Sequence, residues 1–153
     1  MSLSNVHLVT SAPRRIAAVR ARLPVADVPR RFREFLDQVY AAKSSHRLEL
    51  DGQNIFVYRN TSDPDVVDAE FGVGAMKAFA PLGNVVMTEL PTGKAATVTL
   101  LGDYSGIRSG HQAVIDWCKA NGHDRSGARW EIYGHWTDDV SRLQTDIFHQ
   151  VKA

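Results

Sequence analysis

The chain has 153 residues, 44% of them hydrophobic, and a net charge of +1 at pH 7. This length and composition suit one globular domain with a core of its own. The near-zero net charge excludes a protein-wide field that would attract nucleic acid or a membrane. A single cysteine, Cys118, excludes an internal disulfide. No apolar run reaches the ~20 residues that a membrane-spanning helix needs, and no signal-peptide pattern is present, so we expect a cytoplasmic protein.

Charge is distributed unevenly along the chain. Residues 1–47 carry nine Lys and Arg against three Asp and Glu, whereas residues 48–104 carry three against eight. The basic residues are not interleaved with aromatic ones, so they predict a solvated face or a patch for docking a protein partner rather than a nucleic-acid site. Most of them are arginines: Arg14, Arg15, Arg20, Arg22, Arg30, Arg31 and Arg33.

The first predicted elements are a strand and a helix. Residues 6–23 are extended in character, and Pro24 ends them. Asp27 is expected to cap a helix, with Pro29 in its first turn, because these residue types prefer those positions. Apolar residues then recur at i, i+3, i+4, i+7 and i+8, which predicts one buried face on a helix over residues 28–43.

Two strands follow, and the same order of elements then returns. The segments Ile55–Arg59 and Ala69–Phe79 lie between turn residues and predict strands. A further strand is expected at Ala95–Leu101. A second helix is expected over residues 105–121, because apolar side chains again recur at helical spacing and Asn121-Gly122 is typical of a helix end. The last two predicted strands are Trp130–Trp136 and Thr145–Val151.

The order strand, helix, strand, strand therefore occurs twice, in halves of about residues 6–80 and 90–152. Apolar helix positions correspond between the halves at an offset of about 78 residues, and Tyr58 corresponds to Tyr133 at about 75. Two βαββ units can pair their strands into one antiparallel sheet with both helices on one face. We therefore predict an α+β fold in one domain over residues 4–153. A cleft is expected at the pseudo-twofold axis, on the face that the helices leave open.

Glu131 is the residue of these strands that most needs an explanation. It lies in the apolar segment Trp130–Tyr133, where strand alternation puts Glu131 and Tyr133 on one face. A lone carboxylate among aromatic side chains is costly to bury without a partner. Either this face is solvated and the strand is half-exposed, or the carboxylate lies in an aromatic pocket where it meets a cation or a proton.

The sequence contains no metal or phosphate motif. Gly72 and Gly74 are not followed by the lysine of a phosphate-binding loop, so they are expected to relieve a strand crossing or a bulge. Cys118 falls on an apolar helix face and predicts a small core residue. The histidines form no His-x-x-x-His pair, so we expect neither a metal nor another cofactor. They are His7, His46, His111, His123, His135 and His149.

Six segments together carry a resemblance to a known family: Asp68–Val73, Leu90–Ala96, Gly102–Tyr104, Trp117 with Asn121-Gly122, Trp130–Tyr133 and Thr145–Ile147. In order and spacing they resemble the GyrI-like small-molecule-binding domain, which also serves as the effector-binding half of AraC- and MerR-type transcription regulators. The resemblance covers about residues 6–151. The chain departs from the family pattern at His111, where many members have an aromatic residue, and at Phe148–Val151, where a proline commonly precedes the valine.

The resemblance implies two βαββ modules around a central cleft that binds hydrophobic, often cationic, compounds, with Glu131 and Tyr133 at the cleft. Four further residues are candidates for binding the ligand, with packing in the core as the alternative for each. On the strand that holds Phe56 and Tyr58, we expect Tyr58 to face the cleft. The four candidates are Tyr58, Phe71, Tyr104 and His111.

Three functions are compatible with this resemblance. We favour a stand-alone domain that captures hydrophobic small molecules, cations included, and that does not itself bind nucleic acid, since no DNA-binding segment precedes it. The alternative is a hydrolase of cyclopropane-containing electrophiles, as described for some free-standing members, in which Glu131 acts on water and Tyr133 donates a proton. The third is a protein-interaction inhibitor, like the family member that acts on DNA gyrase. An enzyme needs a second polar group near Glu131, and the sequence offers Tyr133 and His111.

Overall fold

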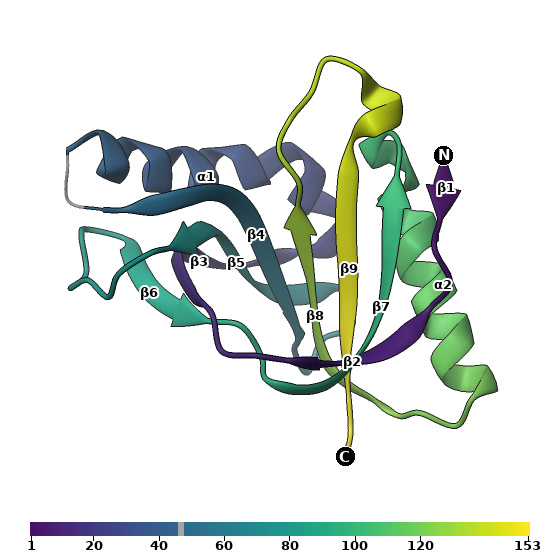
Figure 1. Cartoon of the computed structure of the whole chain (residues 1–153). Helices are drawn as coiled ribbons and strands as arrows, with labels where there is room; N and C mark the ends of the chain where they lie inside the picture. Colours follow the sequence, from purple (N-terminus) through teal and green to yellow (C-terminus); the bar gives the residue numbers. More distant parts are fainter. Residues whose placement is uncertain (46–47) are drawn as a thin grey trace. The chain divides into compact units, whose positions relative to one another are not determined.

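The computed structural model describes residues 1–45 and 48–153, so His46 lies outside the described residues. The chain forms two compact units. The first unit contains residues 13–90, and the second unit contains residues 1–12 and 91–153. Residues 6–12 were predicted to lie in the first half, but they belong to the second unit. Each unit contains one βαββ sequence with antiparallel strand pairs, which confirms the predicted α+β class and the tandem repeat (Figure 1).

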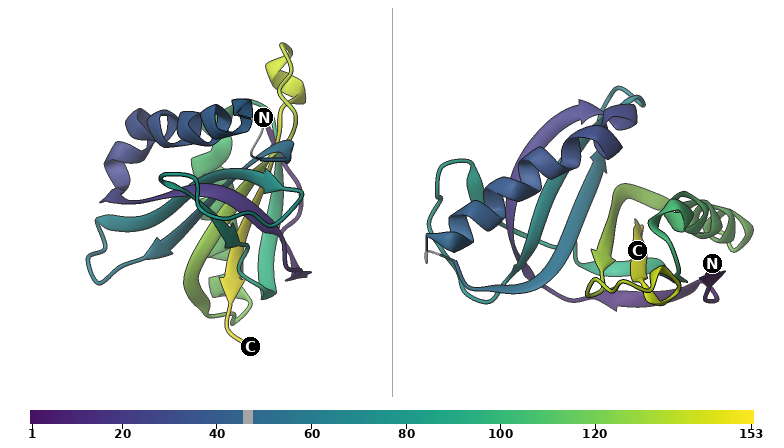
Figure 2. Two further views of the ribbon diagram at one scale, coloured as in Figure 1. Left: turned by 90° about the vertical axis from the view of Figure 1, so that its left-hand side faces the viewer. Right: turned by 90° about the horizontal axis from the view of Figure 1, so that it is seen from above.

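The first unit is a four-stranded antiparallel sheet with α1 packed on one face. β5 pairs with β4 on one side and with β3 on the other, and β6 adds to the outer edge of β3. α1 packs mainly on β3 and β5 (Figure 2). The elements are β3 (Arg15–Pro24), a 3-10 helix (Val25–Asp27), α1 (Val28–Ser44), β4 (Leu50–Asn60), β5 (Val66–Ala75) and β6 (Val85–Glu89).

The helix α1 closely matches the predicted range of residues 28–43, but its N-terminus differs from the prediction in one respect. Pro29 lies in the first turn, as expected. Asp27 is not a side-chain cap, because the preceding 3-10 turn already gives it helical backbone angles, whereas a capping residue needs an extended backbone. Its carboxylate instead pairs with the Arg30 guanidinium at 2.9 Å.

An aromatic cluster centred on Phe71 fills the space between α1 and the first unit's sheet. Phe71 is fully buried and stacks on Phe35 of α1, with ring centroids 5.5 Å apart. Phe56 and Tyr58 of β4 both meet the Phe71 ring edge-on, at 5.2 and 6.1 Å. Residues two apart on a strand share a face, so both side chains lie on the face that α1 covers. Phe56 therefore shares the face of Tyr58, and the contact of Tyr58 with a ligand stays a prediction.

The second unit repeats this arrangement and adds two short N-terminal strands. β9 pairs with β7 and β8, as β5 does with β3 and β4, and α2 packs on β7 and β9. β1 and β2 both pair with β7. The elements are β1 (Ser2–Leu3), β2 (His7–Ser11), β7 (Gly93–Leu101), a 3-10 helix (Tyr104–Gly106), α2 (Ile107–Ala120), β8 (Arg125–Tyr133), a second 3-10 helix (Val140–Arg142) and β9 (Gln144–Val151).

Two predicted strands end earlier in the structure than expected. β5 ends at Ala75 rather than Phe79, and β8 ends at Tyr133 rather than Trp136. Apolar side chains beyond each end imitate a strand pattern, but Tyr133 is the last residue of β8 paired with β9, and Trp136 is 70% exposed in the loop that follows. The edge strand β6 was not predicted, because it is only five residues long and follows a segment rich in turn residues.

Gly72 and Gly74 relieve crowding in the first unit, as predicted. A Cβ on Gly72 would lie 2.5 Å from the backbone carbonyl oxygen of Ala17 on β3. A Cβ on Gly74 would collide with the Asp51 carboxylate, close to a bulge in the pairing of β4 with β5. The obstacle at Gly72 is the backbone of the neighbouring strand, whereas the obstacle at Gly74 is a side chain that can turn away.

The variant Gly72→Ala should therefore lower the free energy of unfolding by about 1–3 kcal/mol, because the new methyl group pushes β5 away from β3. Gly74→Ala, on the same strand and the same face, is the matched control and should lower it by less than about 1 kcal/mol. Urea unfolding of both purified variants measures the difference. A Gly72→Ala protein as stable as the unaltered chain would contradict the close approach of the two strands.

Candidate functional site

Glu131 is buried in the second unit, and both of its carboxylate oxygens are hydrogen-bonded. The residue is 5% exposed and lies on β8 opposite Ile147 of β9. Its Oε1 accepts a hydrogen bond from the Tyr133 hydroxyl at 2.6 Å. Its Oε2 lies 2.6 Å from Nε2 of His111, which comes from α2. The alternative that this face of the strand is solvated is therefore excluded.

The helix α2 covers the face of the second unit that holds Glu131. Ile147 lies directly opposite Glu131 on the neighbouring strand. Gly110 of α2 approaches Ile147 so closely that a Cβ atom on Gly110 would collide with the Ile147 side chain. Trp130 points to the other face, where it stacks on Phe148 at 5.3 Å. The expected location of Glu131 on the face left open by the helices is thus wrong. Gly110 has no side chain, so α2 packs closely against the face of the strands that holds Glu131.

His111 connects Glu131 to a second histidine, His149 of β9. Nδ1 of His111 lies 2.8 Å from Nε2 of His149, and the two rings meet edge-on with centroids 5.0 Å apart. An ionised Glu131 can only accept, so Nε2 of His111 donates to it, and one further proton lies between the two histidines. Tyr133, Glu131, His111 and His149 form a continuous chain of hydrogen bonds, which we call the Tyr-Glu-His-His chain.

His149 is neutral at pH 7. It is 2% exposed, and its burial, followed by the electrostatic effects of His111, Arg125 and Arg129, lowers the pKa of His149 from 6.5 to about 3. A neutral imidazole has one donor and one acceptor nitrogen. His149 therefore orients His111 by a hydrogen bond without adding a charge next to Glu131.

Tyr104 joins this group from the 3-10 helix that precedes α2. Its ring meets the Tyr133 ring edge-on, with centroids 5.5 Å apart, and it is 37% exposed. The side chains of His111 and Glu131 are 17% and 7% exposed. Exposure thus decreases from Tyr104 through His111 to Glu131, so the carboxylate lies well below the surface.

The strand registers show which position of the first unit corresponds to Glu131. Phe56 pairs with Phe71 on β5, as Glu131 pairs with Ile147 on β9, and a tyrosine follows two residues later in each strand. The two units therefore share the same strand pairing but differ in the side chain at this position, which is an aromatic ring in the first unit and a carboxylate in the second. That Tyr58 and Phe71 of the first unit contact the same ligand as Glu131 stays a prediction.

His149 also belongs to this site, although it was not predicted as a site residue. Its strand alternates regularly, with Thr145, Ile147, His149 and Val151 buried and the residues between them more exposed. A histidine at a core position of an alternating strand signals that it has a polar partner inside the protein. The two departures from the family pattern, at His111 and at the end of the chain, contain the two histidines that contact each other.

Among residues 1–45 and 48–153, no cluster of three His, Cys, Asp or Glu side chains could hold a metal ion. Cys118 is a core residue, as predicted, and its burial raises the pKa of its thiol, which makes it a poor nucleophile. No helix in the part of the chain that the structure describes is long and apolar enough to cross a membrane.

The chain belongs to the family of GyrI-like small molecule binding domains, whose family model matches residues 4–152. The C-terminal domain of EcmrR has a similar structure, with a TM-score of 0.78, 19% identity and 99% of both chains covered. SAV2435 bound to tetraphenylphosphonium has a TM-score of 0.72 and 12% identity over 97% of this chain and 94% of that one. A protein from Listeria innocua described as a hydrolase has a TM-score of 0.66 and 9% identity over 97% and 92%. No curated protein matches the chain.

The low pKa of His149 predicts a specific loss of stability in acid. The unfolded chain binds a proton at His149 below about pH 6.5, whereas the folded chain does so only near pH 3, so stability falls as the pH drops between these values. From pH 6.5 to about pH 4.5 the loss from this residue is on the order of 2–3 kcal/mol. Urea unfolding at both pH values measures it.

His149→Gln removes this titration and keeps a hydrogen-bonding group at the same place. The variant should lose less stability between neutral and acid pH than the unaltered protein does. His135→Gln, at an exposed position, is the control and should leave the acid dependence unchanged. The same acid loss in the His149→Gln protein would show that His149 is not buried in its neutral form.

Proposed function

We propose that this chain captures hydrophobic small molecules, cations included, at a cleft whose polar end is Glu131. The observation that carries the proposal is the buried carboxylate, which Tyr133 and His111 hold from both sides at 2.6 Å. A fixed carboxylate in a site of low dielectric attracts a cation more strongly than an exposed one does. The rings of Tyr104 and Tyr133 provide apolar area and negative ring faces for the same ligand.

Family membership and one similar structure support this choice of ligand. The family is one of small-molecule-binding domains, and SAV2435, which has the same fold, is bound to tetraphenylphosphonium. Tetraphenylphosphonium is a lipophilic cation without hydrogen-bond donors. A ligand of this kind meets a carboxylate through charge alone and meets aromatic side chains through its apolar surface, which makes it a suitable probe for the Glu131 site.

Glu131→Gln keeps the shape of the side chain and removes its charge. Its affinity for tetraphenylphosphonium should be roughly ten- to a hundredfold lower, because a charge-assisted contact in a partly dry site contributes ~1.5–3 kcal/mol. Calorimetric titration measures this. Glu70→Gln is the matched control, since Glu70 is also a buried glutamate but belongs to the first unit, and it should bind the probe as the unaltered protein does. Equal affinity of the Glu131→Gln protein would reject an electrostatic role for Glu131.

A second candidate function is the hydrolysis of a cyclopropane-containing electrophile. The observation that favours it is the position of His111, which supplies the second polar group beside Glu131 that an enzyme needs. In this reaction, Glu131 with His111 takes a proton from water as the water oxygen bonds to a ring carbon. The ring C–C bond breaks toward a conjugated carbonyl group, and Tyr133 supplies a proton to the resulting enolate. The net change is the addition of one water molecule.

Turnover distinguishes hydrolysis from capture. If the chain is a hydrolase, a small amount of protein should convert an excess of a carbonyl-conjugated cyclopropane into the ring-opened product that carries one added water. Glu131→Gln should slow this by about 10²–10⁴-fold, as expected for loss of an acid–base group, while His135→Gln should not. Mass spectrometry of the incubation detects the product. An unchanged compound that nevertheless binds saturably would refute hydrolysis and leave capture as the function.

A further inference from the structure

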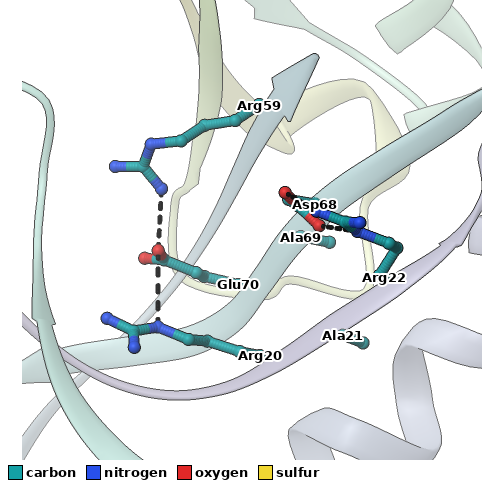
Figure 3. Close-up of a pocket in the computed structure, with 7 residues that line it drawn as sticks. All are labelled: Arg20, Ala21, Arg22, Arg59, Asp68, Ala69 and Glu70. Carbon is teal, nitrogen blue, oxygen red and sulfur yellow. Dashed lines mark hydrogen bonds and ion pairs between the residues drawn. The ribbon is translucent and has the colours of Figure 1, made fainter. Parts of the chain in front are cut away.

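A second polar site lies in the first unit, on the sheet face opposite to α1. It is a cavity of about 430 Å³ lined by β3, β4 and β5 (Figure 3). Because Phe71 of β5 faces α1, its neighbour Glu70 points to the opposite face. The charged residues that line the cavity are Arg20, Arg22, Arg59, Asp68 and Glu70.

These five side chains stand in two adjacent rows across the three strands. In one row Asp68 lies between Arg22 and Arg59, and in the next row Glu70 lies opposite Arg20. Arg22 and Asp68 neutralise each other through two hydrogen bonds of 2.7 and 3.0 Å. Three guanidinium groups face two carboxylates, so the cavity retains one positive charge.

Glu70 carries an acceptor that no group of the described residues satisfies. Its Oε2 accepts a hydrogen bond from Nη1 of Arg59 at 2.7 Å. Its Oε1 is buried, and among the described residues it has no hydrogen-bond partner, although the whole side chain is only 9% exposed. A buried carboxylate oxygen without a donor is unfavourable. The terminal torsion of a glutamate is soft, so a small rotation presents this oxygen to a donor in the cavity.

Arg20 supplies the donors of the site. Its Nε lies 3.9 Å from Oε2 of Glu70, which is too long for a hydrogen bond, and its side chain is 66% exposed. Figure 3 shows Glu70 between the guanidinium groups of Arg20 and Arg59. A guanidinium group has a planar set of N–H donors that matches the two oxygens of a carboxylate. An anion that enters the cavity therefore meets donors from β3 and β4 on both sides of an unused acceptor.

We propose that this cavity binds a small hydroxycarboxylic acid. Arg20 and Arg59 hold the carboxylate of the ligand, and the neighbouring hydroxyl donates a hydrogen bond to Oε1 of Glu70. The single negative charge of such a ligand neutralises the one positive charge that the cavity retains. The site lies in the other unit from Glu131 and selects the opposite charge, so it goes beyond the proposed capture of hydrophobic cations.

Lactate and propionate test this assignment, because they share the carboxylate and differ in the hydroxyl. Calorimetric titration of the full chain should show lactate binding at least about tenfold more tightly than propionate, since only lactate satisfies Glu70. Glu70→Gln should reduce lactate binding to the level of propionate. Arg20→Gln is a change at an exposed position that should not affect folding. It should lower the affinity for both lactate and propionate about tenfold.

Cross-controls separate this site from the Glu131 site. Glu131→Gln should bind lactate normally, while Glu70→Gln should bind tetraphenylphosphonium normally. Equal affinities for lactate and propionate, or no saturation by lactate up to about 50 mM, would overturn the proposal. Binding of inorganic phosphate in place of lactate would overturn the carboxylate assignment. A failure of cation capture would leave these lactate results unaffected, so the two proposals can fail independently.

Discussion

The carboxylate of Glu131 can be buried because both of its oxygens accept hydrogen bonds. An unpaired charge in this position would be strongly destabilising. The Tyr133 partner comes from the same strand and needs only strand alternation, but the His111 partner comes from α2 and needs the helix at one height above the sheet. The close approach of Gly110 to Ile147 sets that height. The site thus depends on how α2 packs, and the packing is apolar.

The need for a hydrogen-bond partner also applies to His149, which occupies a core position on β9. Burial keeps His149 neutral, and its hydrogen bond to His111 gives the second unit a polar layer inside its core. The first unit has Phe56 and Phe71 in the corresponding layer. Both arrangements are favourable, because buried polar groups need hydrogen-bond partners and the remaining core volume must be closely packed. This layer is therefore filled by packed rings in one repeat and by hydrogen-bonded polar groups in its counterpart.

Glu131 and Glu70 show how one residue type is buried in two different environments. Glu131 has a tyrosine and a histidine as partners, and no arginine pairs with it among the described residues. Glu70 lies between two arginines, and the charge left over in its cavity is positive. What distinguishes the two sites is the neighbours of each carboxylate, which the strand register places beside Glu70 and which β8 and α2 supply to Glu131.

The sequence by itself determined the elements of this protein, because helix and strand periodicities are local. It predicted α1 and α2 to within two residues, the βαββ repeat, and the shared face of Glu131 and Tyr133. Tertiary structure decided the rest. Strand β8 ends where its pairing with β9 ends, and α2 covers the Glu131 face because a glycine allows it. His149 meets His111 across 38 residues of sequence. These contacts arise where separate elements pack together, and no pattern within one element encodes which partner it will meet.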